Sequence, residues 1–157
     1  MTAATVTGTR ASTTLPTGGS GPTFGVQAAW GTVTVDDATE DGDIFEVCWL
    51  PAGATVIGGW IMAIDGDTGI EALDIDLGIA ANGVDSADPD MFGNNGVWIG
   101  GKTCATGNWI PLTGVLQTVG PKTFTVPTKV QLETNVAAAT GVAMEVTVVL
   151  LYLFNAP

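Results

Sequence analysis

The chain has 157 residues, enough for one domain with a sizeable core. Sixteen acidic residues against four basic ones give a net charge of −12, which argues against nucleic acid as a direct partner because phosphate binding needs clustered Lys and Arg. Histidine is absent, and with it the commonest general base and metal ligand. Neither ordinary enzyme chemistry nor a cofactor is therefore expected.

The composition favours β-strands joined by turns. Hydrophobic residues make up 46% of the chain and charged residues only 13%, with 22 Gly and 8 Pro. Val, Ile and Thr are common, and these β-branched side chains suit a pleated surface better than a helix. No segment shows a convincing helix start or a helical apolar stripe.

Residues 1–25 are expected to form an extended arm that precedes a β domain over residues 26–157. The arm contains the turn-rich stretch TLPTGGSGPTFG, which cannot bury enough apolar area to fold alone. It carries four candidate partner-binding residues. Val6, Leu15 and Phe24 are apolar anchors, and Arg10 is the only charged residue of the arm. We expect it to bind a partner surface or a neighbouring subunit, for example by adding a strand to a sheet edge.

Strand patterns begin after the arm. The first three predicted strands are Trp30–Val35, Ile44–Leu50 and Thr55–Ile64, the last interrupted by a bulge at Gly58 and Gly59. The next segment has the clearest alternation, with core-facing aliphatics at Leu73, Ile75, Leu77 and Ile79. Asp74 and Asp76 lie between them and are expected on a hydrated outer face.

Residues 82–96 are predicted to form a long polar loop. Met91 and Phe92 lie within it, and two interpretations have equal weight: an exposed apolar tip that inserts into a partner, or a loop folded back on its own core. Further strands are predicted over 97–99, 108–117, 123–126, 128–134 and 142–154. In the last one Val146–Phe154 is strongly apolar, but its nine residues are about half of what a membrane helix needs, so no membrane partner is expected.

About eight strands at this spacing predict an all-β fold, a jelly roll or a related Greek-key β-sandwich. Five tryptophans, at positions 30, 49, 60, 98 and 109, are expected in the core or a subunit interface rather than in a sugar-binding face. For the two cysteines, Cys48 and Cys104, free thiols are favoured over a disulfide between them, and two cysteines alone do not decide it.

Acidic clusters offer the only motifs with candidate chemistry. The segment Asp65–Glu71 superficially resembles a calcium loop, but its spacing departs from the EF-hand pattern and a solvated turn is favoured. Asp85, Asp88 and Asp90 could pair as glycosidase carboxylates, and a hydrated outer face is again favoured.

Charge is segregated along the chain. Residues 36–90 contain 14 of the 16 acidic residues and no Lys or Arg. This distribution is typical of a subunit that presents one face to water and another to a partner.

Residues 43–83 resemble a pattern in jelly-roll capsid decoration (cement) proteins of tailed bacteriophages. The resemblance lies in Leu-Pro-Ala-Gly-Ala at 50–54, the apolar strand 55–64, the acidic turn after it, and Asp-Leu-Gly at 76–78. It implies a non-enzymatic virion protein on the capsid exterior, with the major capsid protein and other copies of itself as partners, a trimer being favoured over a dimer. The alternative is a carbohydrate- or receptor-binding β-sandwich module of a head fibre or tail.

Overall fold

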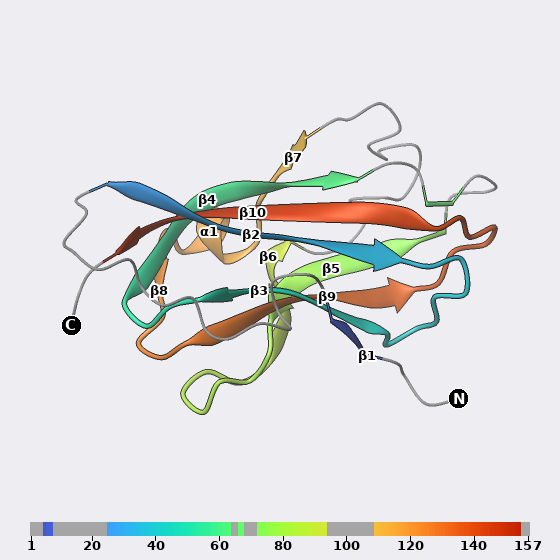
Figure 1. Cartoon of the computed structure of the whole chain (residues 1–157). Helices are drawn as coiled ribbons and strands as arrows, with labels where there is room; N and C mark the ends of the chain where they lie inside the picture. Colours follow the sequence, from blue (N-terminus) through green and yellow to red (C-terminus); the bar gives the residue numbers. More distant parts are fainter. Residues whose placement is uncertain (1–4, 8–24, 64–65, 68–71, 94–108, 155–157) are drawn as a thin grey trace.

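The protein is a sandwich of two β-sheets, seen in a computed structural model that describes residues 5–7, 25–63, 66–67, 72–93 and 109–154 (Figure 1). Sheet A contains strands β1, β3, β9, β5 and β6 in that order. Their bounds are Thr5–Thr7, Ile44–Leu50, Thr128–Val136, Asp74–Ile79 and Asp88–Gly93. Sheet B has the order β2, β10, β4 and β7, with β8 beside β4. Their bounds are Val26–Val35, Met144–Phe154, Ala54–Ala63, Trp109–Pro111 and Lys122–Thr123.

The chain crosses repeatedly between the two sheets. The strands β2, β3, β4 and β5 alternate between sheet B and sheet A, and the longest strand, β10, lies between β2 and β4. All described pairings are antiparallel except that of β1 with β3. This topology confirms the predicted all-β sandwich of the jelly-roll type.

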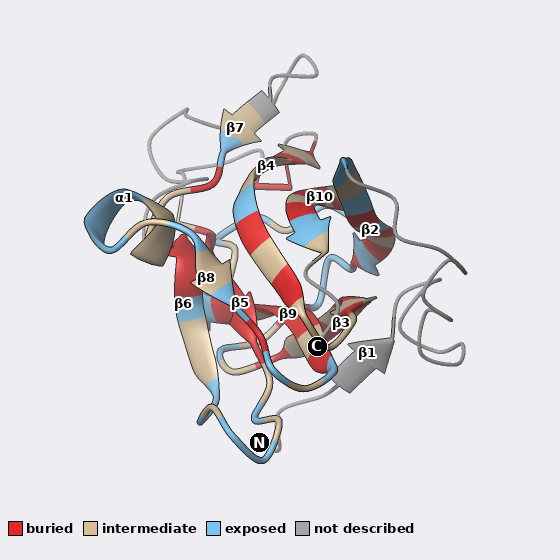
Figure 2. Ribbon diagram, turned by 90° about the vertical axis from the view of Figure 1, so that its left-hand side faces the viewer, coloured by how far each residue is buried: buried red, intermediate tan, exposed pale blue. Residues whose placement is uncertain are grey.

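Alternating burial explains why these segments form strands. Along β10, the side chains of Met144, Val146, Val148 and Leu150 are buried, whereas the residues between them point outward. Figure 2 shows the same alternation as buried and accessible bands. A period of two places every second residue in the space between the sheets, where apolar burial stabilises the fold.

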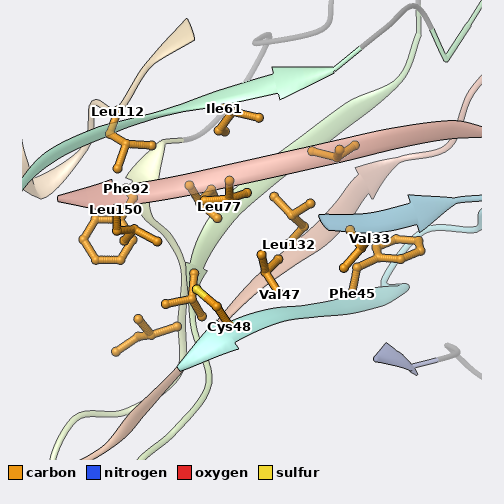
Figure 3. Close-up of a cluster of buried hydrophobic side chains, with 14 of the residues drawn as sticks. Val33, Phe45, Val47, Cys48, Ile61, Leu77, Phe92, Leu112, Leu132 and Leu150 are labelled. Atoms are coloured by element: carbon orange, nitrogen blue, oxygen red, sulfur yellow. The ribbon is translucent and has the colours of Figure 1, made fainter. Parts of the chain in front are cut away.

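The core fills the space between the two sheets (Figure 3). Phe45, Leu77 and Leu132 approach it from sheet A, and Ile61 and Leu150 from sheet B. Leu73, Ile75, Leu77 and Ile79 are all buried, as predicted.

Two glycines allow backbones to approach each other. A Cβ at Gly31 would collide with the carbonyl oxygen of Val47, where β2 crosses β3. Gly59 has a φ of 153°, and a Cβ there would collide with the carbonyl oxygen of Val149. The register of β4 and β10 shifts beside Gly58, which confirms the predicted bulge.

Three predicted segments differ in the structure. Of the predicted strand 123–126, only Thr123 belongs to a strand, β8, and the predicted strand 97–99 lies outside the described residues. Strand β6 occupies Asp88–Gly93, inside the predicted loop 82–96. The predicted strand 108–117 contains β7 and then the one-turn helix α1, Val115–Thr118. Both are short pieces at the edge of a sheet, where a strand tolerates Pro and needs no long alternating pattern. Within the described residues, no helix is long and apolar enough to cross a membrane.

Candidate functional site

The outer face of sheet B is nearly free of charge. In its central row, Val149 of β10 lies between Trp30 of β2 and Trp60 of β4. Four further apolar residues point outward around this row: Val26, Ile57, Leu151 and Leu153. Among the outward-pointing residues of β2, β4 and β10, only Glu145 is charged. We call this surface the uncharged face.

Two pairs of hydroxyl groups on the uncharged face bond to each other across strands. The Oγ1 atoms of Thr32 and Thr147 are 2.8 Å apart, and those of Thr55 and Thr123 are 2.9 Å apart. Each pair supplies its own donor and acceptor, which lowers the cost of removing the face from water. The chemistry of the face therefore suits a dry contact with another apolar protein surface.

A hollow of about 480 Å³ lies at one end of the uncharged face. Thr34, Met62, Glu145 and Thr147 are among its lining residues. The exposed indole of Trp30 lies in the neighbouring row of the sheet. One face thus carries both a projecting aromatic residue and a recess.

The outer face of sheet A carries the opposite kind of surface. Glu46 of β3, Glu133 of β9 and Asp76 of β5 point away from the core. We call this surface the acidic face. Lys129 lies among these carboxylates, with its Nζ 2.6 Å from Glu46 Oε1 and 5.0 Å from the ring centre of Trp49. The two outer faces of the sandwich thus differ in charge, while most of the described acidic residues between 36 and 90 lie in loops.

The prediction of a hydrated surface for Asp74 and Asp76 is wrong. Both lie opposite the core aliphatics, as expected, but both side chains are buried. Strand β5 is an interior strand of sheet A, flanked by β9 and β6, and Asp76 lies opposite Glu133 of β9. Asn135 of β9 donates from Nδ2 to Asp74 Oδ2 at 3.2 Å, which compensates part of the burial cost.

Trp30, Trp49 and Trp60 lie outside the core, and nothing is described of the Trp109 side chain. Trp30 is 43% exposed, and Trp49 and Trp60 are half-buried on outer faces. The sequence predicted that the tryptophans lie in the core or in a subunit interface. The core placement is wrong for these three residues, and the interface placement stays a prediction. Trp98 lies outside the described residues. Cys48 is buried in the core cluster, and Cys104 also lies outside the described residues.

Met91 and Phe92 do not form an exposed tip. Both belong to β6, and Phe92 is 0% exposed. The rings of Phe92 and Phe124 meet edge to face with centroids 6.3 Å apart. The segment folds back on its own core, which was the second of the two interpretations, so these side chains are not presented to a partner.

The arm residues are described only in part. Thr5–Thr7 forms β1, which pairs in parallel with β3 and places Val6 opposite Phe45. The arm thus contributes an edge strand to sheet A of its own chain. Arg10, Leu15 and Phe24 lie outside the described residues, so their role as partner-binding residues stays a prediction.

Asp67 fastens two loops together. Its Oδ2 accepts backbone N–H groups from Ala72, Leu73 and Ala139, and its Oδ1 accepts that of Thr140, at 2.9 to 3.2 Å. The side chain is 0% exposed. Burial alone would raise the pKa of Asp67, but these four backbone donors outweigh it and lower the pKa to about 2.

This role corrects the expectation for the 65–71 segment, because Asp67 is not part of a solvated turn. Its carboxylate oxygens are already bonded to main-chain donors, which leaves them poorly suited to bind calcium. Within the described residues, no group of three or more His, Cys, Asp or Glu side chains is placed to hold a metal ion.

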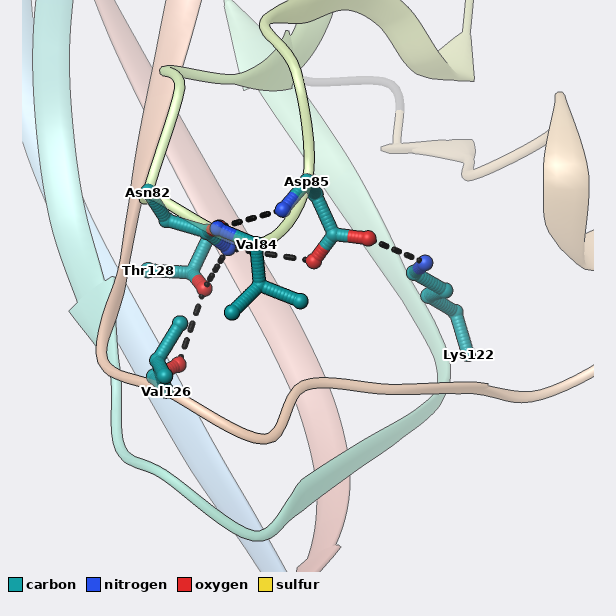
Figure 4. A network of polar contacts seen from close by, with 6 residues as sticks. All are labelled: Asn82, Val84, Asp85, Lys122, Val126 and Thr128. Carbon is teal, nitrogen blue, oxygen red and sulfur yellow. Dashed lines mark hydrogen bonds and ion pairs between the residues drawn. The ribbon is translucent and has the colours of Figure 1, made fainter.

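Asp85 anchors the loop between β5 and β6 (Figure 4). Its Oδ1 accepts from Lys122 Nζ at 2.9 Å, and its Oδ2 accepts from Asn82 Nδ2 at 3.1 Å. The bonds from Lys122 and Asn82 lower the pKa of Asp85. Asn82 also donates to Thr128 Oγ1 at 2.7 Å. This network ties the loop to β8 and β9, a structural role for a residue considered as a glycosidase carboxylate.

Asp88, which neighbours Asp90 on β6, is the one carboxyl group with a raised pKa in the described part of the chain. Burial, followed by the hydrogen bond to Asp90 and repulsion from it, raises the pKa of Asp88. Hydrogen-bonded carboxyl groups lie closer together than the roughly 5 Å or more that separates glycosidase pairs. Their geometry therefore does not fit that chemistry.

Comparisons with known proteins give structural matches only. No family model matches the sequence, and no curated protein sequence matches it significantly. A chain in the capsid of Ralstonia phage GP4 matches with a TM-score of 0.72 and 19% identity, over 98% of this chain and 100% of that chain. A chain in the capsid asymmetric unit of cyanophage Pam1 matches with a TM-score of 0.68 and 25% identity, over 92% and 96%. A chain in the acid-stable capsid of Helicobacter pylori bacteriophage KHP30 matches with a TM-score of 0.52 and 15% identity, over 82% and 87%. The sandwich is thus a fold that also occurs in phage capsids.

Proposed function

We propose that the chain is a non-enzymatic structural protein of a phage virion, and that it decorates and stabilises the outside of the head. The observation that carries this proposal is the end-to-end match to the GP4 capsid chain, which covers 98% of this chain and all of the other. A match of this kind relates two chains of similar length, rather than one domain within a larger protein. The Pam1 match, at 92% and 96% coverage, supports the same conclusion.

The two faces of the sandwich support a position outside the shell. A subunit that lines the inside of a capsid meets packaged nucleic acid, and a chain of net charge −12 would repel its phosphates. On the exterior, exposed loop carboxylates such as Asp36, Asp37 and Asp41 are hydrated, and the uncharged face contacts protein. The expected partners are the major capsid protein and further copies of this chain.

The test is the composition and structure of purified particles. We expect mass spectrometry to find the chain in many copies per particle, and electron microscopy to place its sandwich on the outer surface of the head. Adding purified protein to particles that lack it should restore that density and raise the temperature at which the heads rupture. Density confined to the tail, or absence from the particles, would contradict the proposal.

A carbohydrate- or receptor-binding role is the second candidate. Its supporting observation is that Trp30 and Trp60 share one row of the uncharged face, because aromatic rings can stack on sugars. The paired threonine hydroxyls weigh against it, since sugar recognition uses polar groups that bond to the ligand. A glycan that quenches tryptophan fluorescence saturably, with the quenching lost in Trp30→Ala, would favour this role.

A further inference from the structure

We infer that two copies of this chain pack against each other through their uncharged faces, with the Trp30 side chain of each copy seated in the hollow of the other. The inference deepens the proposed function by naming one partner surface. It rests on the charge distribution, on the placement of the projection and the recess, and on the paired hydroxyl groups.

The charge distribution favours the uncharged face for contact with a second copy of the chain. Each copy carries −12, and most described carboxylates lie on sheet A or in the loops. Two copies that meet through those surfaces would place carboxylates against carboxylates. The uncharged face contains Glu145 alone among the outward residues of its three long strands. It is the surface where a second copy can approach with the least repulsion, and a basic partner would be attracted elsewhere.

The strand register makes the face complementary to itself. The row Trp30–Val149–Trp60 is separated from the row of Thr34 and Glu145 by the row Thr32–Thr147–Met62. Two copies can be stacked face to face with a two-fold axis that runs along the Thr32–Thr147–Met62 row, in the plane between the faces. This axis places the Trp30–Val149–Trp60 row of one copy over the row of Thr34 and Glu145 of the other. Each Trp30 then meets the partner's hollow, as an isologous contact requires.

The contact can be dry. The Thr32 and Thr147 hydroxyls bond to each other at 2.8 Å, so stacking a second sheet about 10 Å away leaves this pair bonded. Trp30 supplies the kind of exposed aromatic side chain that dominates interface energetics. A two-fold contact gives a dimer, which differs from the trimer favoured from the sequence.

Sedimentation equilibrium of the full chain at micromolar concentration tests the inference. We expect a dimer, and we expect Trp30→Glu to raise the dimer dissociation constant by about 30-fold or more, as for an interface hot spot. Val84→Glu is the matched control, because Val84 is exposed in the β5–β6 loop, away from the face. It should leave the dissociation constant and the melting temperature unchanged, whereas Trp30→Glu should melt at the temperature of the wild-type monomer, measured at concentrations below the dimer dissociation constant.

A charge comparison then tests which residue Trp30 meets. The inferred packing places position 30 beside Glu145 of the second copy, so Trp30→Lys should bind about fivefold more tightly than Trp30→Glu. That difference should vanish in a Glu145→Gln background. Equal dissociation constants for the Lys and Glu variants would overturn the seating of Trp30 in the hollow.

Other outcomes overturn the inference itself. A wild-type chain that stays monomeric, or a Trp30→Glu variant that dimerises normally, would show that the face does not bind a second copy. If the wild-type chain is monomeric and Trp30→Glu abolishes binding to phage heads, the occupant is the capsid shell. Sedimentation equilibrium uses the purified protein without phage particles. A monomeric result would therefore not contradict the proposed virion role, and absence of the chain from particles would not contradict the dimer.

Discussion

Replacing Asp67 with Asn should destabilise the protein in a way that depends on pH. The Asp67 carboxylate is fully buried and bonded to four backbone N–H groups, which belong to residues 72–73 and 139–140. An Asn side chain keeps one oxygen acceptor but turns an NH₂ group toward at least one backbone donor. The substitution removes the charge and leaves a buried donor unpaired.

The magnitude follows from the pKa of Asp67, which falls from 3.8 to about 2 on folding. This lowering corresponds to about 2 kcal/mol of folding free energy at neutral pH. Because the folded pKa lies below the unfolded one, the contribution is complete above pH 3.8 and is lost as the pH falls toward 2. The unpaired donor adds about 1–3 kcal/mol that does not depend on pH.

Urea denaturation of the wild type and Asp67→Asn at neutral pH and at several acidic values measures both parts. We expect the stability difference to be largest at neutral pH and to shrink by about 2 kcal/mol as the pH falls through this window. Asp37→Asn, at an exposed position, is the control and should change little. A difference that is constant with pH would refute the electrostatic reasoning, and no difference at any pH would refute the structural role of Asp67.

Two further predictions concern the core and the arm. Ile75→Asp should unfold the domain, because Ile75 is fully buried and an unpaired buried charge costs several kcal/mol out of a free energy of unfolding of about 5–15 kcal/mol. Ile75→Val should lower the free energy of unfolding by only about 0.5–1.5 kcal/mol. Circular dichroism during urea titration distinguishes the two variants. Deleting residues 1–25 removes the three-residue strand β1 and should lower the melting temperature by no more than about 5 °C, while sharply reducing binding to heads that lack the protein. A truncated chain that binds heads as well as the full chain would show that the arm is not the contact.

Long alternating segments were predictable from the sequence. Strand β3 has the predicted bounds, Ile44–Leu50, and β10 lies within the predicted segment 142–154. In both, apolar residues repeat with a period of two over enough positions to indicate a strand. Strand β6 was missed because Pro89 and its flanking aspartates give a loop-like composition, and its three consecutive buried residues show no alternation.

Features that depend on distant residues could not be predicted. Two of the backbone donors to Asp67 lie 72 and 73 residues away in the chain, so nothing near Asp67 indicates that its carboxylate is buried. The same applies to Asp74, whose carboxylate accepts a hydrogen bond from Asn135, 61 residues away in the chain. For Trp30 and Trp60, a period of two indicates that they share a face, but only the packing of the two sheets determines that this face points outward.

The inferred dimer should depend on salt in an unusual direction. In each copy the acidic face lies across the sandwich from the uncharged face, and stacked sheets are about 10 Å apart. Four stacked sheets therefore place the two acidic faces about 30 Å from each other. This distance exceeds the Debye length of about 8 Å at 0.15 M salt and equals that of about 30 Å at 0.01 M. Repulsion between the acidic faces is thus screened at physiological salt and felt at low salt.

Dimerisation should accordingly tighten as salt rises to about 0.15 M and then change little, because the contact itself is apolar. Sedimentation equilibrium over this range measures the dissociation constant directly. A contact made by oppositely charged groups would instead weaken steadily as salt is added. A dissociation constant that rises with salt from the lowest concentration would therefore contradict packing through the uncharged faces, since a surface with a single carboxylate offers no ion pairs to screen.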